Sequence, residues 1–218
     1  MNRFSKEPMR LFLVRHGETA DNVQMRYLGT RDEPLTTNGI RQARQIAAAL
    51  SELPIGIIIT SPLRRAADTA AQIQKACGVE LRTDARLVEG SFGKWEGLTR
   101  SEVLKLGHQD AEELSRWETD PSFPPPGGES FESVRDRMID VVEQLRIEFG
   151  GASAVLVSHV GPIKALIASA LSIPLLSSSR FFLDPGTISV VDWSDSPLLR
   201  LFNSHAHQGW TSARWMKS

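Results

Sequence analysis

Cysteine is almost missing from the sequence, since Cys77 is the only one in 218 residues. A single thiol cannot form a disulfide within the chain, which is typical of proteins from a reducing compartment. An excess of either charge is missing too, because 25 basic residues nearly balance 26 acidic ones, for a formal charge of −1. A near-neutral chain offers no general basic surface to nucleic acid or anionic lipid. Any anion that it binds must be held by a local group of residues.

Long hydrophobic runs are missing as well. The most apolar long window, 155–176, contains two prolines, a histidine and a lysine, too many interruptions for a membrane-spanning helix. The first ten residues contain no apolar signal core. We therefore expect a cytoplasmic protein with a single domain over 1–218 and no nucleic-acid or membrane partner.

Short apolar runs alternate with helical patterns along the chain. Runs rich in leucine or β-branched residues, as expected of strands covered on both faces, lie at 11–14, 55–59 and 153–158. Amphipathic helices are expected at about 37–52, 62–77, 130–149 and 161–172, and an antiparallel pair of strands at 187–193 and 198–203. This alternation predicts an α/β fold, a three-layer sandwich with a mostly parallel central sheet and helices on both faces.

Two of the helices allow more detailed predictions. The first should bury Ile40, Ala43, Ala47 and Leu50 on one face. The second should start with Ser61 as N-cap and Pro62 as its first residue, and should end at Gly78.

From about 91 to 129 the alternation stops. A capping box from Thr99 to Glu102 should start one short helix, a second should carry Trp117, and the stretch PSFPPPGGES follows. This segment is typical of an insertion over the active-site rim, a candidate lid or specificity wall. Its aromatic residues, Trp95, Trp117 and Phe123, either line a substrate wall or fix the insertion to the core.

Charged and polar side chains follow several of the predicted strands, where ligands bind in open α/β sheets. The residues delivered to that rim are Arg15 and His16 from the first strand, Arg64 and Arg65 from the second, Glu89 from the run VELRTDARLVEG, and His159 from the strand 153–158. We expect these side chains to meet.

This combination suits a phosphate monoester. Arg15, Arg65 and a partly protonated His159 would neutralise the dianion, with each charge-assisted bond contributing about 1.5–3 kcal/mol. Repulsion by the arginines would keep His16 neutral, with a lone pair for attack on phosphorus. Glu89 would protonate the leaving oxygen and then accept a proton from water. Because phosphoryl transfer depends on positioning and charge stabilisation, we expect neither a metal nor another cofactor.

Six stretches in a fixed order resemble the histidine phosphatase superfamily, in its phosphoglycerate mutase-like branch: VRHGETADN, GTRDEPLTTNGIRQA, TSPLRRAADTA, LVEGSFGKWEG, PPGGES and VSHVGPIKAL. The resemblance covers about residues 10–170. It implies that His16 becomes the phosphohistidine and Glu89 the proton donor. It also implies that Arg15, Arg65 and His159 bind the phosphoryl group with help from Asn22, and that Gly29 and Val160 contact substrate.

The chain departs from the family pattern at one place. Many members read HGGxIR, whereas this chain reads HVGPIK from His159 to Lys164. Val160 still offers a backbone N–H to a phosphate, but Lys164 in place of arginine changes a nearby contact and bears on substrate choice.

Three functions are compatible with these residues. A phosphomonoesterase acting on a small phosphorylated metabolite, similar to broad-specificity and α-ribazole phosphatases, is favoured over a mutase because phosphoglycerate mutases have a longer insertion with a tyrosine-containing motif. A non-catalytic sensor of phosphorylated ligands is the third, although a pure binder has no need of Glu89. A homodimer through a sheet edge is compatible with the sequence.

Other candidate chemistry is weaker. Cys77 precedes Arg82 by four intervening residues, whereas a cysteine phosphatase needs five, so we expect Cys77 to pack. His205 and His207 have the spacing of two ligands on one strand face, but no third ligand is evident and we expect no metal. Arg64 is expected on the solvated surface.

Overall fold

The computed structural model describes residues 7–209, so the expectation about a signal segment concerns residues that lie mainly outside the described part. Six strands form one sheet: β1 (Met9–Arg15), β2 (Ile57–Thr60), β3 (Glu80–Thr83), β4 (Ser153–Ser158), β5 (Ile188–Trp193) and β6 (Leu198–Ser204). Their order is β3-β2-β4-β1-β5-β6. The first four are mutually parallel, while β5 runs antiparallel to β1 and β6 antiparallel to β5. The mostly parallel sheet and the terminal antiparallel pair are confirmed.

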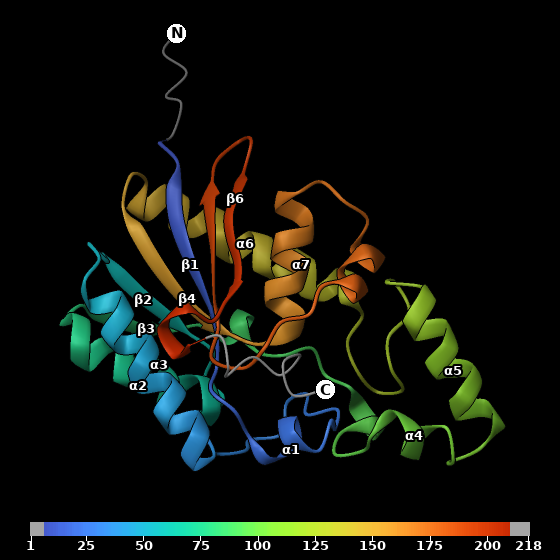
Figure 1. Ribbon diagram of the computed structural model, residues 1–218. Helices are drawn as coiled ribbons and strands as arrows, with labels where there is room; N and C mark the ends of the chain where they lie inside the picture. The colour runs from blue at the N-terminus through green and yellow to red at the C-terminus, as the bar shows by residue number, and fades with distance from the viewer. Residues whose placement is uncertain (1–6, 210–218) are drawn as a thin grey trace, which may run out of the picture.

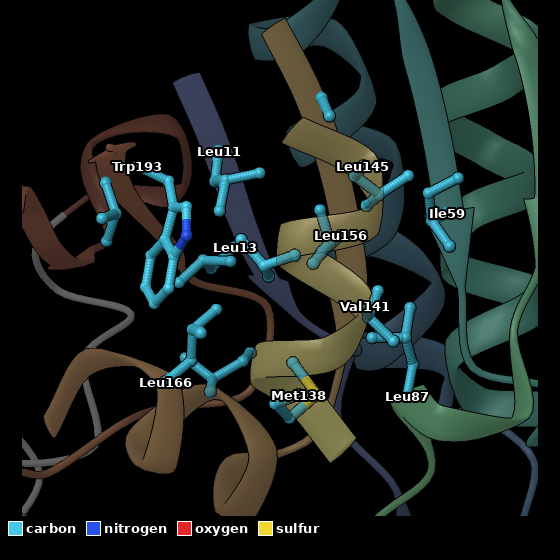
Figure 2. Packing of buried hydrophobic residues seen from close by; sticks show 14 of the residues in the cluster. Leu11, Leu13, Ile59, Leu87, Met138, Val141, Leu145, Leu156, Leu166 and Trp193 are labelled. Carbon is cyan, nitrogen blue, oxygen red and sulfur yellow. The ribbon is translucent and has the colours of Figure 1, made fainter. Parts of the chain in front are cut away.

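Helices cover both faces of the sheet (Figure 1). The helices α2 (Thr37–Ser51) and α3 (Arg64–Cys77) lie on one face, and α6 (Phe131–Phe149) and α7 (Val160–Ala170) on the other. Alternate residues of β1 face opposite layers, so Leu11 and Leu13 belong to the core under α6 and α7, whereas Phe12 and Val14 belong to the core under α2 and α3. Figure 2 shows the first of these cores, where Leu13 and Leu156 from the strands face Met138 and Val141 of α6. The predicted three-layer sandwich is confirmed.

Three local predictions need correction. Ile40 is 40% exposed, and the inner face of α2 instead includes Ile46 beside Ala43, Ala47 and Leu50. Helix α3 begins at Arg64, not at Pro62, because Ser61 forms a turn in which its hydroxyl accepts from the backbone N–H of Leu63, the actual N-cap. The second strand begins at Ile57. Gly78 does end α3, in the left-handed conformation with φ of 69° that favours glycine.

The insertion lies beyond the carboxyl ends of the parallel strands (Figure 1). Its helices are α4 (Arg100–Val103), which starts with the predicted Thr99–Glu102 capping box, and α5 (His108–Thr119), which carries Trp117. Trp95 is fully buried with Val103 and Leu114 in a small core of the insertion's own, so it fixes the insertion and does not line a wall. Phe123 stacks under the guanidinium of Arg116, 4.2 Å from the ring centroid.

The shorter elements connect these parts: α1 (Ala20–Val23) and the 3₁₀ turns η1 (Ala85–Leu87), η2 (Gly93–Trp95), η3 (Leu175–Arg180) and η4 (Ala206–Gln208). Between residues 7 and 209, no helix has the length and apolar character needed to span a membrane.

Candidate active site

Three neighbouring strands deliver the central side chains to one rim of the sheet. Residues Arg15 of β1 and Ser158 of β4 are register partners, so His16 and His159 follow adjacent strand ends. Their imidazole rings lie 5.0 Å apart between centroids. Strand β2 ends beside β4 and leads through Ser61 into α3, whose first turn holds Arg65. The predicted meeting of these residues from distant parts of the chain is therefore observed.

Arg65 occupies the centre of the site and is fully buried. Its Nε–H donates to both histidines, at 3.3 Å to Nε2 of His16 and 3.2 Å to Nδ1 of His159. Its two terminal nitrogens donate to the backbone carbonyls of Gly29, at 2.8 Å, and Arg31, at 2.6 Å. The loop that carries Gly29 thus fixes the guanidinium so that its Nε edge faces the imidazoles.

The hydrogen bonds of His16 define its tautomer. Its Nδ1 lies 2.7 Å from the carbonyl oxygen of Gly17, which can only accept, so Nδ1 carries the proton. Its Nε2 accepts from Arg65 and therefore has its lone pair on the side of the cluster. Burial lowers the pKa of His16 well below 6.5, and the charges of Arg65 and Arg15 lower it further. The predicted neutral imidazole is supported, with burial as a larger cause than the arginines.

In the unliganded site, burial, followed by the charge of Arg65, lowers the pKa of His159 well below 6.5 and favours the neutral ring. The expected partial protonation of His159 concerns the site with a phosphate bound and stays a prediction. Its Nδ1 accepts from Arg65, which leaves the proton on Nε2, 2.8 Å from the hydroxyl of Ser61. Ser61 is therefore a site residue that the sequence interpretation assigned only to a helix cap. Its position within the TSPLRRA stretch was the available signal.

Arg15 is held from the far side of β1. Its guanidinium donates to the carbonyl of Leu183, and the N–H of Gly186 donates to the carbonyls of both Arg15 and His16, at 3.1 and 2.9 Å. The segment 183–187, which precedes β5, thus supports both residues. Nothing in its sequence marks this role, because the contact depends on β5 pairing antiparallel with β1.

Glu89 reaches the rim from a loop and not from a strand end, since β3 stops at Thr83. Its Oε1 accepts from the backbone N–H groups of Gly90, at 2.9 Å, and Gly161, at 3.1 Å. A Cβ atom at position 161 would collide with that oxygen, so a side chain there would displace the carboxyl group of Glu89 from this position. Burial raises the pKa of Glu89 above 4.5, against the opposing hydrogen bonds and arginine charges. A raised pKa favours the protonated form that a general acid needs.

Three further residues, Asn22, Gly29 and Val160, are expected to contact the substrate, and their surroundings differ. Asn22 is 9% exposed and its side chain accepts from the N–H of Thr19 in a capping box that opens α1. The carbonyl of Gly29 is bound to Arg65, so Gly29 acts on the cluster through that side chain. Val160 is the first residue of α7, where backbone N–H groups and the helix dipole favour an anion.

Several residues lie outside the cluster. Arg64 has a 61% exposed side chain that pairs with Asp68, as expected of a surface residue. Cys77 is half-buried, and burial raises the pKa of its thiol. His205 precedes the η4 turn and His207 lies within it, so the two do not share a strand face. His205 pairs with Asp184 at 2.8 Å, and His207 lies 2.8 Å from the carbonyl oxygen of Gly186. Over residues 7–209, no group of three potential ligands is arranged to hold a metal ion.

A cavity of about 440 Å³ opens directly beside Glu89. It lies between the insertion and the core, and Trp117 of α5 forms part of its wall, in contrast to Trp95. Lys164 of α7 lines it as well.

Comparisons with known proteins agree with this geometry. The family model of the histidine phosphatase superfamily (branch 1) matches residues 11–204. A bifunctional protein of Mycobacterium tuberculosis is 38% identical over 187 residues, which cover 85% of this chain and 50% of that protein. The chain thus spans about half the length of this relative.

Other relatives match over most of their length. The adenosylcobalamin/alpha-ribazole phosphatase of Salmonella typhimurium is 34% identical over 91% of this chain and 98% of its own, and a probable phosphoglycerate mutase of Serratia proteamaculans is 35% identical over 88% of each. The solved structure of mycobacterial hydrolase 1 superposes with a TM-score of 0.83 at 31% identity, covering 92% of this chain and 100% of that one. On the strength of the family match and the shared fold, the chain belongs to the histidine phosphatase superfamily.

Proposed function

We propose that this protein is a phosphate monoester hydrolase that works through a covalent phosphohistidine on His16. The observation that carries the proposal is the neutral, oriented imidazole: the Nε2 lone pair of His16 points into a cluster of cations, 3.3 Å from Nε of Arg65. A nucleophile beside buried guanidinium groups suits attack on a phosphate dianion.

In the first step the phosphoryl oxygens replace the imidazoles as acceptors of the N–H of Arg65. The lone pair of His16 Nε2 forms a bond to phosphorus, and the bond from phosphorus to the ester oxygen breaks. The electron pair of that bond leaves with the ester oxygen, which takes the proton of Glu89. The dianion also raises the pKa of His159, so that its Nδ1 can take up a proton and donate to a phosphoryl oxygen.

In the second step water enters the position of the departed alcohol. The carboxylate of Glu89 accepts a proton from this water as its oxygen attacks phosphorus. The bond between phosphorus and nitrogen breaks, the electron pair returns to His16 Nε2, and inorganic phosphate leaves. Arg15, Arg65 and the N–H of Val160 stabilise the charge of the transferring group in both steps, which is the task that a metal ion performs in other phosphoryl transfers.

The test compares the wild-type protein with the His16→Ala variant on an aryl phosphate, with and without EDTA. We expect release of inorganic phosphate by the wild type, its loss in the variant, and no effect of EDTA. Retained turnover by His16→Ala, or abolition by EDTA, would contradict the proposal. Supplying phosphoglycerate with a bisphosphoglycerate primer separates the mutase alternative, because a mutase yields isomerised product and a phosphatase yields inorganic phosphate.

A further inference from the structure

The cavity beside Glu89 is placed to receive the alcohol that leaves. Glu89 lines it while its carboxyl group also touches the N–H of Gly161, two residues after His159. Because the general acid must contact the ester oxygen, a substrate whose phosphoryl group sits on His16 projects its other half into this cavity. A volume of about 440 Å³ is within the range of sites that hold a whole small molecule.

The wall of the cavity is mainly apolar and partly aromatic. The apolar side chains come from four separate segments and include Phe92, Trp117, Phe131, Val134, Leu175 and Leu176. Phe92 and Trp117 pack edge to face, with ring centroids 5.6 Å apart. Such a wall gains free energy by covering a ring or another compact apolar body, at about 25 cal/mol per Å² buried.

Among the charged side chains that line the cavity, Lys164 has no hydrogen-bonded counterion within the described residues. Glu118 is paired with Arg100 at 2.6 Å, and Glu129 with Arg137 at 2.9 Å. Lys164 is half-buried, and no described residue forms a hydrogen bond or salt bridge with its ammonium group. Burial, and then the charge of Arg15, lower the pKa of Lys164 to about 8, against the opposing charge of Glu89. A half-buried ammonium in an apolar wall is an incomplete ion pair.

We infer that the leaving group of the natural substrate is an apolar, ring-sized body bearing one carboxylate that pairs with Lys164. The phosphoryl group is already served by Arg15 and Arg65, so Lys164 meets the other half of the ester. The single charge of the lysine ammonium balances one carboxylate, whereas a second phosphate monoester carries about −1.5 to −2 charges and would need more than one cation. This inference rests on the proposed function and names its substrate class.

The experiment uses four synthetic esters with similar alcohol leaving groups: ethyl phosphate, benzyl phosphate, and the meta and para isomers of carboxybenzyl phosphate. We expect the wild type to prefer benzyl over ethyl phosphate, and one carboxybenzyl isomer over benzyl phosphate, in kcat/KM. The preference for the carboxylate should fall about 10- to 100-fold in Lys164→Met, as the loss of a charge-assisted bond requires. Lys164→Arg should retain most of it. Lys75→Met, which removes an exposed lysine on α3, is the matched control and should keep the full preference.

Inhibition by inorganic phosphate separates the two halves of the site. Lys164→Met should change the inhibition constant of inorganic phosphate much less than it changes kcat/KM for the preferred carboxybenzyl ester. If Lys164→Met weakens the binding of inorganic phosphate as much as it lowers kcat/KM for the benzyl and carboxybenzyl esters, Lys164 serves the phosphoryl group and the inference is wrong. If the wild type prefers neither carboxybenzyl isomer over benzyl phosphate, the inference is wrong as well, while the proposed hydrolysis stands. Absence of any turnover by the wild type would overturn the proposed hydrolysis and this inference together.

Discussion

Replacing Glu89 with glutamine separates the two proton transfers of the proposed cycle. Oε1 of Glu89 holds the backbone N–H groups of Gly90 and Gly161, and the amide oxygen of glutamine can accept both bonds. The substitution therefore removes the transferable proton and largely preserves the contacts. General acid–base help of about 10²–10⁴ in rate is then lost, which corresponds to roughly 3–5 kcal/mol of transition-state stabilisation.

The loss should depend on the leaving group. An alkyl phosphate needs a proton on its leaving oxygen, so its kcat/KM should fall by about 10²–10⁴ in Glu89→Gln. The leaving oxygen of para-nitrophenyl phosphate is stable as an anion, so its kcat/KM should fall less than about tenfold. Water attack on the phosphohistidine still lacks its base, so the phosphoenzyme should accumulate.

The assay is a stopped-flow measurement of nitrophenolate release. Glu89→Gln should give a rapid burst of about one equivalent per enzyme molecule, followed by slow turnover, since the first step stays fast while the second is slowed. Equal losses in kcat/KM for the alkyl and nitrophenyl esters would refute the assignment of Glu89 as general acid. A slow reaction without a burst would refute its role as the base for water.

Three further predictions concern pH, the insertion and the C-terminal turn. The acid limb of kcat/KM should lie below pH 6.5, because burial and the charges of Arg65 and Arg15 lower the pKa of His16. The limb should move to higher pH in Arg65→Met but not in the exposed Arg64→Met, because Arg64 is not among the charges that lower this pKa; a limb unmoved by Arg65→Met would contradict the electrostatic account. Trp95→Ala should destabilise the protein by about 3–5 kcal/mol in chemical denaturation, because its ring is fully buried. The substitution should also expose the insertion to limited proteolysis, and an unchanged cleavage pattern would argue against a small core in the insertion. Asp184→Ala should destabilise the protein by about 1–3 kcal/mol, because it leaves the imidazole of His205 buried without its hydrogen-bond partner. It should also lower kcat more than the exposed Asp68→Ala, since Asp184 is in the segment that supports Arg15; equal effects of the two substitutions would show that this segment does not position Arg15.

The layered fold could be predicted because its signals are local. The run SAVLVS is strand β4 at the expected bounds, and the amphipathic helix expected at about 130–149 is α6, which buries Val134, Met138, Val141 and Leu145. The true start of α3 at Arg64 could not be predicted in the same way, because a serine before a proline, as at Ser61, locally favours an N-cap. In the fold that serine bonds His159, and the helix begins three residues later.

The convergence of His16, Arg65 and His159 could be predicted, but the electrostatics of this cluster could not. Strand order brings His16 and His159 to adjacent ends, and the motifs mark both. The protonation of His159 depends on full burial and on a bond from Arg65, which no spacing in the sequence reveals. The support of Arg15 by Leu183 likewise exists only because β5 returns antiparallel beside β1.

The central claim is that the phosphoryl group passes through His16. Rapid quenching of the wild-type protein during turnover of an aryl phosphate, followed by peptide mass spectrometry at alkaline pH, tests it directly. One phosphoryl group should be found on the peptide that contains His16, in an acid-labile linkage, and should be absent from His16→Ala. A phosphoryl group on another residue, or turnover with no phosphorylated peptide under conditions that preserve phosphohistidine, would contradict the claim.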